Sequence, residues 1–297
     1  MNKVALVKPA ILITILASSL FLQAVSAPSE ASEVEITPKV RVRGPRGRGG
    51  GKPTPGAATG VLGTKPPSPK DRWAVVIGIS DYYGTANDIE YADDDALDVL
   101  EALIEVYGYD RKNVLLLVSD YKVNNATRED IVKAIDWLKE NAGKNSEVFF
   151  FYSGHGARGK ADDGDREAID EAMVPYECSS ASLIWDGELR TMFSNFETSR
   201  IVFVFDSCYS GGMGDLKADG RIVVMACSES GLSYEGDAWQ NGQFTWYFAD
   251  QGMLEGLADT NSVDGKVTVE ESFDYASANC AFQKPAIIDS FENDMLP

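Results

Sequence analysis

The sequence predicts an α/β fold in which a mostly parallel sheet of about six strands carries helices on both faces. Short, continuous apolar runs, typical of strands covered on both sides, alternate with longer segments whose apolar residues recur at helical spacing. Two of the apolar runs end in glycine-rich loops that each carry one reactive side chain. Because active sites in such sheets lie beyond the carboxyl ends of the strands, we expect function at these two loops.

The elements follow from these patterns in chain order. The predicted strands are the apolar runs Trp73–Ile79, Asn113–Val118, Glu147–Tyr152, Arg200–Phe205, Arg221–Ala226 and Pro285–Ile288. The predicted helices are Tyr91–Tyr107, Thr127–Ala142, Asp186–Asn195, Phe244–Gly252 and Val269–Asn279. Thr127 and Asp130 have the spacing of a capping box, which predicts where the second helix begins.

Composition divides the chain into three parts. Residues 1–27 have a basic start, the apolar stretch Ala10–Leu22 and then small residues, which predicts a cleaved signal peptide and a secreted, extracellular protein. An uncleaved membrane anchor is the alternative, but the apolar stretch is short for a span of about 20 residues. Residues 28–70 are rich in Arg, Gly and Pro, which predicts a disordered pro-segment or linker. Residues 71–297 are long enough for one domain.

Charge is distributed unevenly between these parts. Residues 71–297 hold 17 basic and 43 acidic residues, a formal charge of −26. Such a surface repels nucleic acid and anionic membranes and attracts cations and basic substrates, although adaptation to salt would give the same composition. We therefore expect no nucleic-acid partner and, after removal of the signal, no membrane association. The basic run at 41–52 could bind nucleic acid, but export favours a spacer or a cleavable pro-segment.

The candidate catalytic pair is His155, the only histidine in the chain, and Cys208. His155 lies in YSGHG (152–156) and Cys208 lies in DSCYSG (206–211), each directly after a predicted strand. A cysteine nucleophile needs a base near neutral pH, and imidazole is the side chain suited to that role. A lone histidine is often structural, but glycines on both sides leave this one little to pack against. If Cys208 is the nucleophile, the pairing of Cys178, Cys227 and Cys280 stays open, a Cys178–Cys280 bridge being one option.

Together, in this order and strand context, the two motifs resemble those of metacaspases, in the caspase and legumain superfamily of cysteine peptidases. The resemblance covers roughly residues 72–290 and implies a caspase-like three-layer sandwich, a monomer and no organic cofactor. It also implies that Cys208 attacks the scissile carbonyl, that His155 protonates the leaving amine, and that the amides of Gly156 and Cys208 bind the oxyanion. Tyr209 stands where a typical metacaspase has histidine, which suggests a divergent prokaryotic member.

The same resemblance implies specificity for a basic residue before the cut, and so protein or peptide substrates with Lys or Arg. Asp95, Ser153 and Asp206 match the positions that hold the basic side chain. Two carboxylates in a partly closed pocket favour an ammonium or guanidinium group. The alternative for the run Asp93–Asp95 is a helix cap that complements the dipole. Ala92 stands where many metacaspases have cysteine, which leaves the pocket edge open.

A regulatory Ca²⁺ site is a further implication of the resemblance. Asp170, Asp186 and Asp215 match calcium ligands of many metacaspases, and carboxylate oxygens from separate loops suit this ion. Gly187 replaces a neighbouring ligand aspartate. A second acidic stretch, Asp259–Glu270, lacks the spacing of a calcium-binding loop and is interpreted as a turn before a helix.

A zymogen is also expected. An enzyme specific for basic residues would accept its own exposed linker, which predicts self-cleavage between about residues 41 and 53. The candidate sites are Arg41, Arg43, Arg46, Arg48 and Lys52, with Lys217 and Arg221 as a second region. Two other functions stay open: a legumain-like peptidase that cuts after Asn or Asp, and a non-catalytic caspase-like binding module.

Overall fold

The structure, a computed structural model, describes residues 34–43, 56–120, 122–123, 125–164, 167–261 and 263–297. The predicted signal peptide and the candidate cleavage sites Arg46, Arg48 and Lys52 lie outside the described residues. Within the described ranges, no helix has the length and apolar character needed to cross a membrane.

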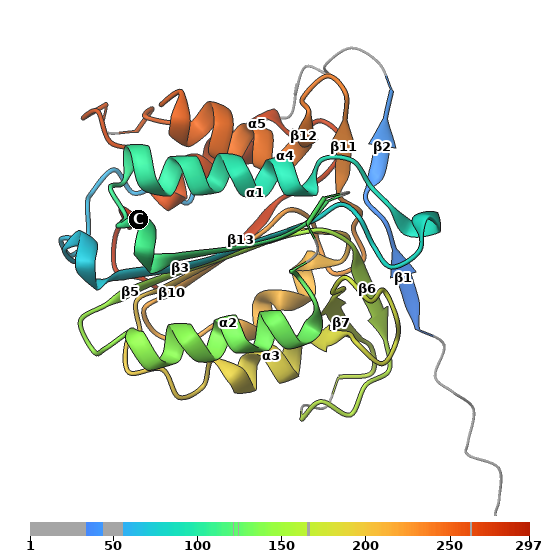
Figure 1. The fold of residues 1–297 in the computed structure, drawn as a ribbon. Helices are drawn as coiled ribbons and strands as arrows, with labels where there is room; N and C mark the ends of the chain where they lie inside the picture. The colour runs from blue at the N-terminus through green and yellow to red at the C-terminus, as the bar shows by residue number, and fades with distance from the viewer. Residues whose placement is uncertain (1–33, 44–55, 121, 124, 165–166, 262) are drawn as a thin grey trace, which may run out of the picture. The chain divides into compact units, whose positions relative to one another are not determined.

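The centre of the domain is a six-stranded sheet with the strand order β13-β10-β9-β5-β3-β4 (Figure 1). Five strands run parallel, and only β13 at one edge is antiparallel to its neighbour. The bounds are β3 Arg72–Ile79, β4 Val114–Ser119, β5 Glu147–Ser153, β9 Ile201–Asp206, β10 Arg221–Met225 and β13 Ala286–Asp289. The predicted α/β fold with about six mostly parallel strands is confirmed.

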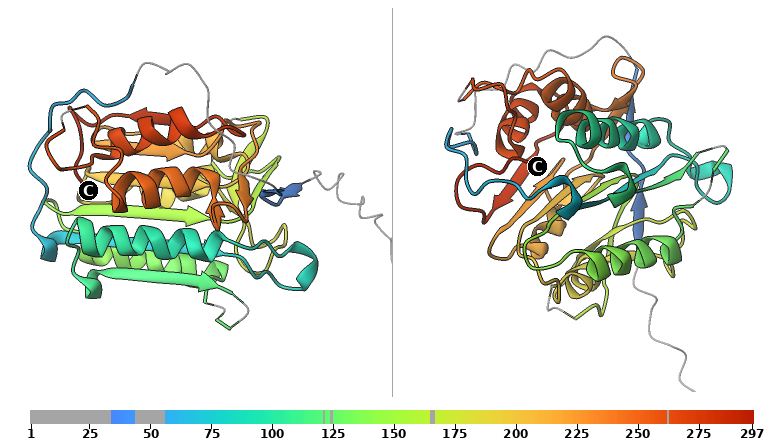
Figure 2. Two further views of the ribbon diagram at one scale, coloured as in Figure 1. Left: turned by 90° about the horizontal axis from the view of Figure 1, so that it is seen from above. Right: turned by 60° about the vertical axis from the view of Figure 1, so that its left-hand side comes forward.

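Helices cover both faces of this sheet (Figure 2). One face packs against α1 (Ala92–Glu101), its π-helical continuation η3 (Ala102–Val106), η6 (Trp246–Leu254) and α5 (Val269–Asn279). The other face packs against α2 (Arg128–Asn141) and α3 (Asp186–Met192). The alternation of the strand explains the two cores, since Val75 and Ile77 of β3 face α2 while Ala74 and Val76 face α1. Successive strand residues thus bury into opposite layers, which is why these strands are apolar throughout.

The predicted start of α2 is confirmed. Thr127 is the N-cap residue, its hydroxyl accepts from the amide of Asp130, and the Asp130 carboxylate accepts from the Thr127 amide. Thr268 and Glu271 form the same reciprocal arrangement at the start of α5. Both boxes satisfy amide groups that the first turn of a helix leaves without internal partners.

Two smaller sheets stand at the carboxyl end of the central strands. One has the order β1-β6-β7-β8 and the other β12-β11-β2. Their bounds are β1 Glu35–Thr37, β2 Val40–Val42, β6 Gly156–Gly159, β7 Asp170–Met173, β8 Ile184–Trp185, β11 Tyr234–Gly236 and β12 Asn241–Gly242. The remaining short helices are η1 Pro69–Asp71, η2 Thr85–Asn87, η4 Arg111–Asn113, η5 Ser210–Leu216 and α4 Gln243–Thr245.

Strands β1 and β2 correct one expectation about residues 28–70. Of these residues, 34–43 form strands that pair with the domain, and 56–60 are held by carboxylates of its C-terminal part. Asp274 accepts from the amide of Ala57, and Asp294 accepts from the amide of Gly60. Composition alone predicted a linker because these segments bury few apolar groups; their order comes instead from polar contacts with distant residues.

The four cysteines are free thiols. Cys227 and Cys208 are buried, and Cys178 and Cys280 are partly buried. The Cys178–Cys280 bridge, left open from the sequence, is therefore absent from the described residues.

Candidate active site

The register of the central sheet places His155 and Cys208 side by side. Ser153, the last residue of β5, pairs with Asp206, the last residue of β9, and each reactive residue follows two positions later. The backbones of the two loops touch, since a Cβ on Gly156 would lie 1.7 Å from the carbonyl oxygen of Cys208. Only glycine fits at position 156, because a side chain there would meet the backbone of Cys208.

Contacts to the ring fix the orientation of His155. Its Nε2 lies 2.6 Å from the backbone oxygen of Asn87, and its ring stacks on Tyr82 with centroids 4.1 Å apart. A carbonyl oxygen only accepts, so Nε2 carries the proton and Nδ1 presents a lone pair. Nδ1 has no hydrogen-bond partner among the described residues. The histidine is thus held in the tautomer that can take a proton at Nδ1.

Cys208 is 1% exposed and lies under the segment that joins β1 to β2. Its thiol donates to the backbone oxygen of Pro38 at 3.4 Å, and its sulfur accepts from the amide of Ser233 at 3.3 Å. Burial raises the pKa of Cys208 to about 12 and lowers the pKa of His155 to about 4. In this state the pair is therefore a neutral thiol and a neutral imidazole at pH 7.

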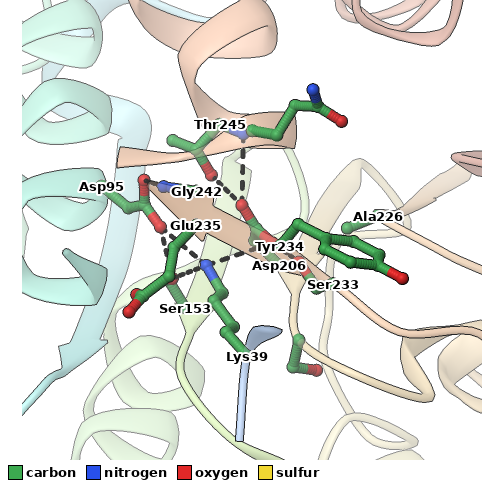
Figure 3. A network of polar contacts seen from close by, with 12 residues as sticks. Lys39, Asp95, Ser153, Asp206, Ala226, Ser233, Tyr234, Glu235, Gly242 and Thr245 are labelled. Atoms are coloured by element: carbon green, nitrogen blue, oxygen red, sulfur yellow. Dashed lines mark hydrogen bonds and ion pairs between the residues drawn. The ribbon is translucent and has the colours of Figure 1, made fainter. Parts of the chain in front are cut away.

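A buried lysine occupies the predicted specificity pocket. The Nζ atom of Lys39 lies 2.8 Å from Asp95 and 3.1 Å from Asp206, and it donates to the Ser153 hydroxyl at 2.7 Å (Figure 3). The side chain of Lys39 and both carboxylates are fully buried. The three predicted pocket residues, from α1, β5 and β9, thus converge on one ammonium group.

Other hydrogen bonds hold the pocket carboxylates in place. Asp95 accepts from the Ser153 hydroxyl at 2.6 Å and from the Gly242 amide at 2.7 Å. Asp206 accepts from the hydroxyl groups of Ser233 and Thr245 at 2.5 and 2.7 Å. Burial disfavours the charge of Lys39, but Asp206 and Asp95 outweigh it and raise the pKa of Lys39 above its usual value. The ammonium group of Lys39 therefore stays charged although it is buried.

Lys39 was not among the residues singled out from the sequence. The basic positions Lys39, Arg41 and Arg43 alternate with apolar Val40 and Val42, which is the period of a strand with one polar face. That short alternation was the available signal, but the flanking proline and the basic composition favoured a linker. Asp95, the third acid of its run, is buried within α1, and the N-cap residue of this helix, Tyr91, makes no side-chain cap, so the capping alternative does not explain Asp95.

Tyr209 takes the place of the usual metacaspase histidine beside the nucleophile. Its backbone is left-handed (φ 61°), and its hydroxyl lies 3.0 Å from the Thr37 hydroxyl and donates to Glu35 at 3.1 Å. The Arg158 guanidinium lies 4.6 Å from the centre of its ring and pairs with Glu35. These contacts attach Tyr209 to strand β1 rather than to the catalytic pair.

The predicted calcium residues are only partly brought together. Asp170 and Asp186 are buried and, with Asp163, place carboxylate oxygens within 4.8 Å of one another. Asp215 instead forms an ion pair with Arg190 at 3.1 Å, which corrects its assignment to this set. Asp163 replaces it from the loop before β7: its carboxylate accepts from the Gly187 amide at 2.9 Å and fills the space that a side chain at 187 would take. The other acidic stretch is a turn before α5, as expected, in which Asp259 accepts from the amides of Asp264 and Gly265.

The fold is that of a caspase-like α/β domain, and comparisons with known proteins agree with it. Residues 72–217 match the family described as metacaspase, peptidase C14 domain. The chain is 35% identical over 150 residues to Metacaspase-1 of Botryotinia fuckeliana, covering 49% of this chain and 36% of that protein. It is 33% identical over 150 residues to Metacaspase-1 of Schizosaccharomyces pombe, covering 49% and 35%. The chain thus spans just over a third of the length of these curated relatives.

A solved structure supports the fold. The crystal structure of protein GSU0716 from Geobacter sulfurreducens aligns with a TM-score of 0.55 and 20% sequence identity, over 73% of this chain and 92% of that one. At this identity the similarity concerns the fold alone. The sequence matches are stronger, and they show that residues 72–217 are similar to the metacaspase C14 family, whose members are cysteine-type endopeptidases.

Proposed function

We propose that this protein is a cysteine endopeptidase that cuts peptide bonds after Lys or Arg, with Cys208 as nucleophile and His155 as acid and base. The observation that carries the proposal is the buried Lys39 ammonium between Asp95 and Asp206. A pocket that already holds a lysine side chain through three predicted specificity residues has the size and charge for a basic substrate residue. The match to the C14 family supports the same chemistry.

The geometry suits acyl transfer. The Cys208 sulfur attacks the scissile carbonyl while its proton moves to Nδ1 of His155. The oxyanion accepts from the amides of Gly156 and Cys208, an arrangement typically worth about 3 kcal/mol of barrier. Collapse breaks the C–N bond, His155 gives its proton to the leaving amine, and a thioester remains on Cys208. Water then attacks the thioester, His155 takes a proton from it, and the acid product and the free thiol are released.

The pocket argues against the two alternatives. An aspartate before the cut would bring a third negative charge to two buried carboxylates, and an asparagine would leave both without a cation, which disfavours legumain-like specificity. A non-catalytic module needs neither a nucleophile nor a base, yet this chain keeps both, with the His155 tautomer fixed by Asn87. The acidic surface predicted from composition also suits basic substrates.

A panel of fluorogenic peptides that differ only in the residue before the cut tests this function. Arg and Lys peptides should be cleaved, and Ala, Asn and Asp peptides should be cleaved at least about 100-fold more slowly, as expected when a buried charge is left unpaired. A preference for Asn or Asp would reject the assignment of Asp95 and Asp206. Each peptide should be tested with and without Ca²⁺.

We also propose that the protein processes itself. Arg41 lies in strand β2 and Arg43 directly follows it, whereas Lys217 and Arg221 follow the nucleophile in the chain. Arg221 is buried in β10, where it donates to backbone oxygens of Leu216 and Phe193, so the exposed residues that begin at Lys217 or those near Arg43 are the better substrate. N-terminal sequencing of the wild type and Cys208→Ala, purified in the same way, tests this, because identical termini would exclude self-processing.

A regulatory cation is proposed at Asp163, Asp170 and Asp186. The three carboxylates approach one another closely, and Oδ1 of Asp163 has no hydrogen-bond partner among the described residues. Oxygen ligands from three separate segments suit the flexible coordination of Ca²⁺ better than the octahedral demand of Mg²⁺. When bound, the ion would offset the negative charge of these three carboxylates, which follow His155 in the chain.

Export is proposed from residues 1–27 alone. A basic start, an apolar stretch and small residues are the pattern of a secretory signal. The mature domain would act outside the cell on protein substrates as a monomer. Comparison of the N-terminus of the secreted and the cell-retained protein would test the signal cleavage.

A further inference from the structure

The cleft of the proposed peptidase is filled by residues 34–43 of its own chain. Strand β1 pairs antiparallel with β6, and Thr37 is the register partner of Gly156. Strand β2 pairs with β11, and Val40 is the register partner of Tyr234. Lys39 lies between the two strands with its side chain in the pocket (Figure 3). The segment therefore covers the specificity pocket, the nucleophile and the strand that provides the oxyanion-binding amide.

The bond beside the nucleophile is the wrong one for cleavage after Lys39. The carbonyl oxygen in contact with the Cys208 thiol belongs to Pro38, at 3.4 Å. Attack at that carbonyl would place proline on the acyl side and Lys39 on the leaving side, whereas a pocket for basic residues serves the bond that follows the lysine. The pocket thus binds the side chain of Lys39, while the sulfur contacts the carbonyl group of the peptide bond that precedes Lys39.

The leaving nitrogen is also held in place by a backbone hydrogen bond. Cleavage after Lys39 would release the amine of Val40, which would have to take a proton from His155. In the structure this N–H donates to the backbone oxygen of Ser233 at 2.8 Å, and the thiol proton of Cys208 is donated to Pro38. The thiol of Cys208 therefore does not donate its proton to His155 in this state, which agrees with the neutral forms of both residues.

We propose that residues 34–43 form an inhibitory segment, anchored by Lys39 in the specificity pocket and held one peptide bond out of register with Cys208. The segment keeps the enzyme inactive, and its departure from the cleft activates it. This inference rests on the proposed peptidase function and adds its regulation. Backbone pairing on both sides of Lys39 fixes the register, so the segment acts as an inhibitor and not as a substrate in place.

Arg41 is a second anchor outside the pocket. Its guanidinium pairs with Asp237 at 2.6 Å and with Glu90, and its side chain is one-third exposed. Exposed ion pairs contribute little and are weakened by salt, whereas a buried lysine between two carboxylates depends strongly on its charge. The two anchors should therefore contribute unequally, with Lys39 dominant.

Initial rates on an arginine peptide test the segment in the full chain. Lys39→Ala should raise the initial rate about tenfold or more over the wild type by shifting the population toward an open cleft. Arg41→Ala should raise it less, and high salt should reduce the difference from the wild type. Lys133→Ala, which alters an exposed lysine of α2 paired only with Glu129, is the matched control and should leave the rate unchanged.

Alkylation of Cys208 by iodoacetamide provides a readout that does not depend on turnover. Mass spectrometry should show slow modification of Cys208 in the wild type and fast modification in Lys39→Ala, with Cys178 unchanged between them. Arg41→Ala leaves no buried charge unpaired, so it gives the same test if Lys39→Ala fails to fold. Equal alkylation of Cys208 in the wild type and a folded variant would overturn the inhibitory segment.

A synthetic peptide of residues 34–43 tests the register. Added to the Lys39→Ala variant, it should inhibit turnover and be recovered with its Lys39–Val40 bond intact, while the same peptide with alanine at position 39 should not inhibit. Rapid cleavage after Lys39 would show a substrate and overturn the inference. If the wild type is active and Lys39→Ala is no faster, the inhibitory segment is rejected and the proposed peptidase function stands. If Cys208 of Lys39→Ala is alkylated fast but no peptide is cleaved, the inhibitory segment stands and the peptidase function is rejected.

Discussion

The specificity pocket and the catalytic pair lie at the same edge of one sheet, but they respond to burial in opposite ways. In the pocket, the Lys39 ammonium is buried between two carboxylates, which raise its pKa, while burial raises the pKa of Asp95. In the catalytic pair, His155 and Cys208 are each 1% exposed and become neutral, because neither has an opposite charge close enough to offset the loss of water. Lys39 thus keeps its charge because two carboxylates converge on it, whereas His155 and Cys208 lack such partners and become neutral.

From this difference we expect that the pocket recognises a charged side chain and that His155 and Cys208 become reactive only when water reaches them. The same segment covers both, so its removal would leave two carboxylates in need of a cation and a thiol whose pKa returns toward its usual range. Substrate binding would restore the charge balance of the pocket. The comparison therefore links recognition and activation through one set of contacts.

The largest expected effect is loss of catalysis on removal of either member of the pair. Cys208→Ala and His155→Ala should each abolish cleavage of an arginine peptide, since no other histidine is present to replace the base. Circular dichroism should show that both variants remain folded. Cys178→Ser, a partly buried thiol outside the pair, is the control and should keep its activity. Turnover by either alanine variant would reject the dyad.

The next effect concerns the pocket charges. Asp206→Asn or Asp95→Asn should lower kcat/KM for arginine peptides by a factor that corresponds to about 2–5 kcal/mol of transition-state stabilisation. The reason is that a buried guanidinium would lose one of two partner charges. Asp94→Asn is the matched control in the same helix and should change kcat/KM by about 0.5 kcal/mol or less, since Asp94 is half-buried and outside the pocket contacts. Equal losses in all three variants would show a general electrostatic effect instead of a pocket.

Most of the central sheet was predictable because its strands are buried on both faces and therefore apolar throughout. Strands β3, β5 and β9 lie within one or two residues of the predicted bounds, and the motif loops follow from them. The short strands β6 to β8 and β11 to β12 were not predicted, since two to four residues show no reliable period. Their pairing depends on the loops that the central sheet brings together.

The site shows the same limit at single residues. Asp95, Ser153 and Asp206 were found through their motif positions, whereas Lys39 and Asp163 lie in segments whose composition is typical of linkers and loops. Lys39 is buried in the pocket because two carboxylates from α1 and β9 meet around it. Asp163 approaches Asp170 and Asp186 because Gly187 leaves space for it. Such contacts are set by tertiary structure and leave no local pattern.

Measuring the free energy of unfolding as a function of pH tests whether His155 is neutral in the folded protein, as the contrast with the charged pocket requires. The pKa of His155 is lowered from 6.5 to about 4, chiefly by burial, so the unfolded chain binds this proton more readily than the folded one. Stability from this group is therefore present above pH 6.5 and is lost as the pH falls toward 4, by about 3 kcal/mol in total. Urea unfolding of the wild type and His155→Gln at pH 7 and pH 4.5 measures it. The wild type should lose more stability than the variant, and equal losses would show that His155 is not buried in solution.

The smallest expected effect concerns the second group of buried carboxylates, where a metal ion would play the part that Lys39 plays in the pocket. Calcium at about 100 times its dissociation constant should raise the free energy of unfolding by about 2.7 kcal/mol if it binds only the folded state. Asp170→Asn and Asp163→Asn should reduce this increase, because each removes an oxygen ligand from the cluster. Asp215→Asn should retain it, because Asp215 pairs with Arg190 and lies outside the cluster. Thermal unfolding with Ca²⁺, with Mg²⁺ and with a chelator measures the three responses, and Ca²⁺ should exceed Mg²⁺. A loss of the calcium response in Asp215→Asn but not in Asp163→Asn would return the site to the ligand set that the family resemblance implied. No response in the wild type would show that these carboxylates are buried without a metal.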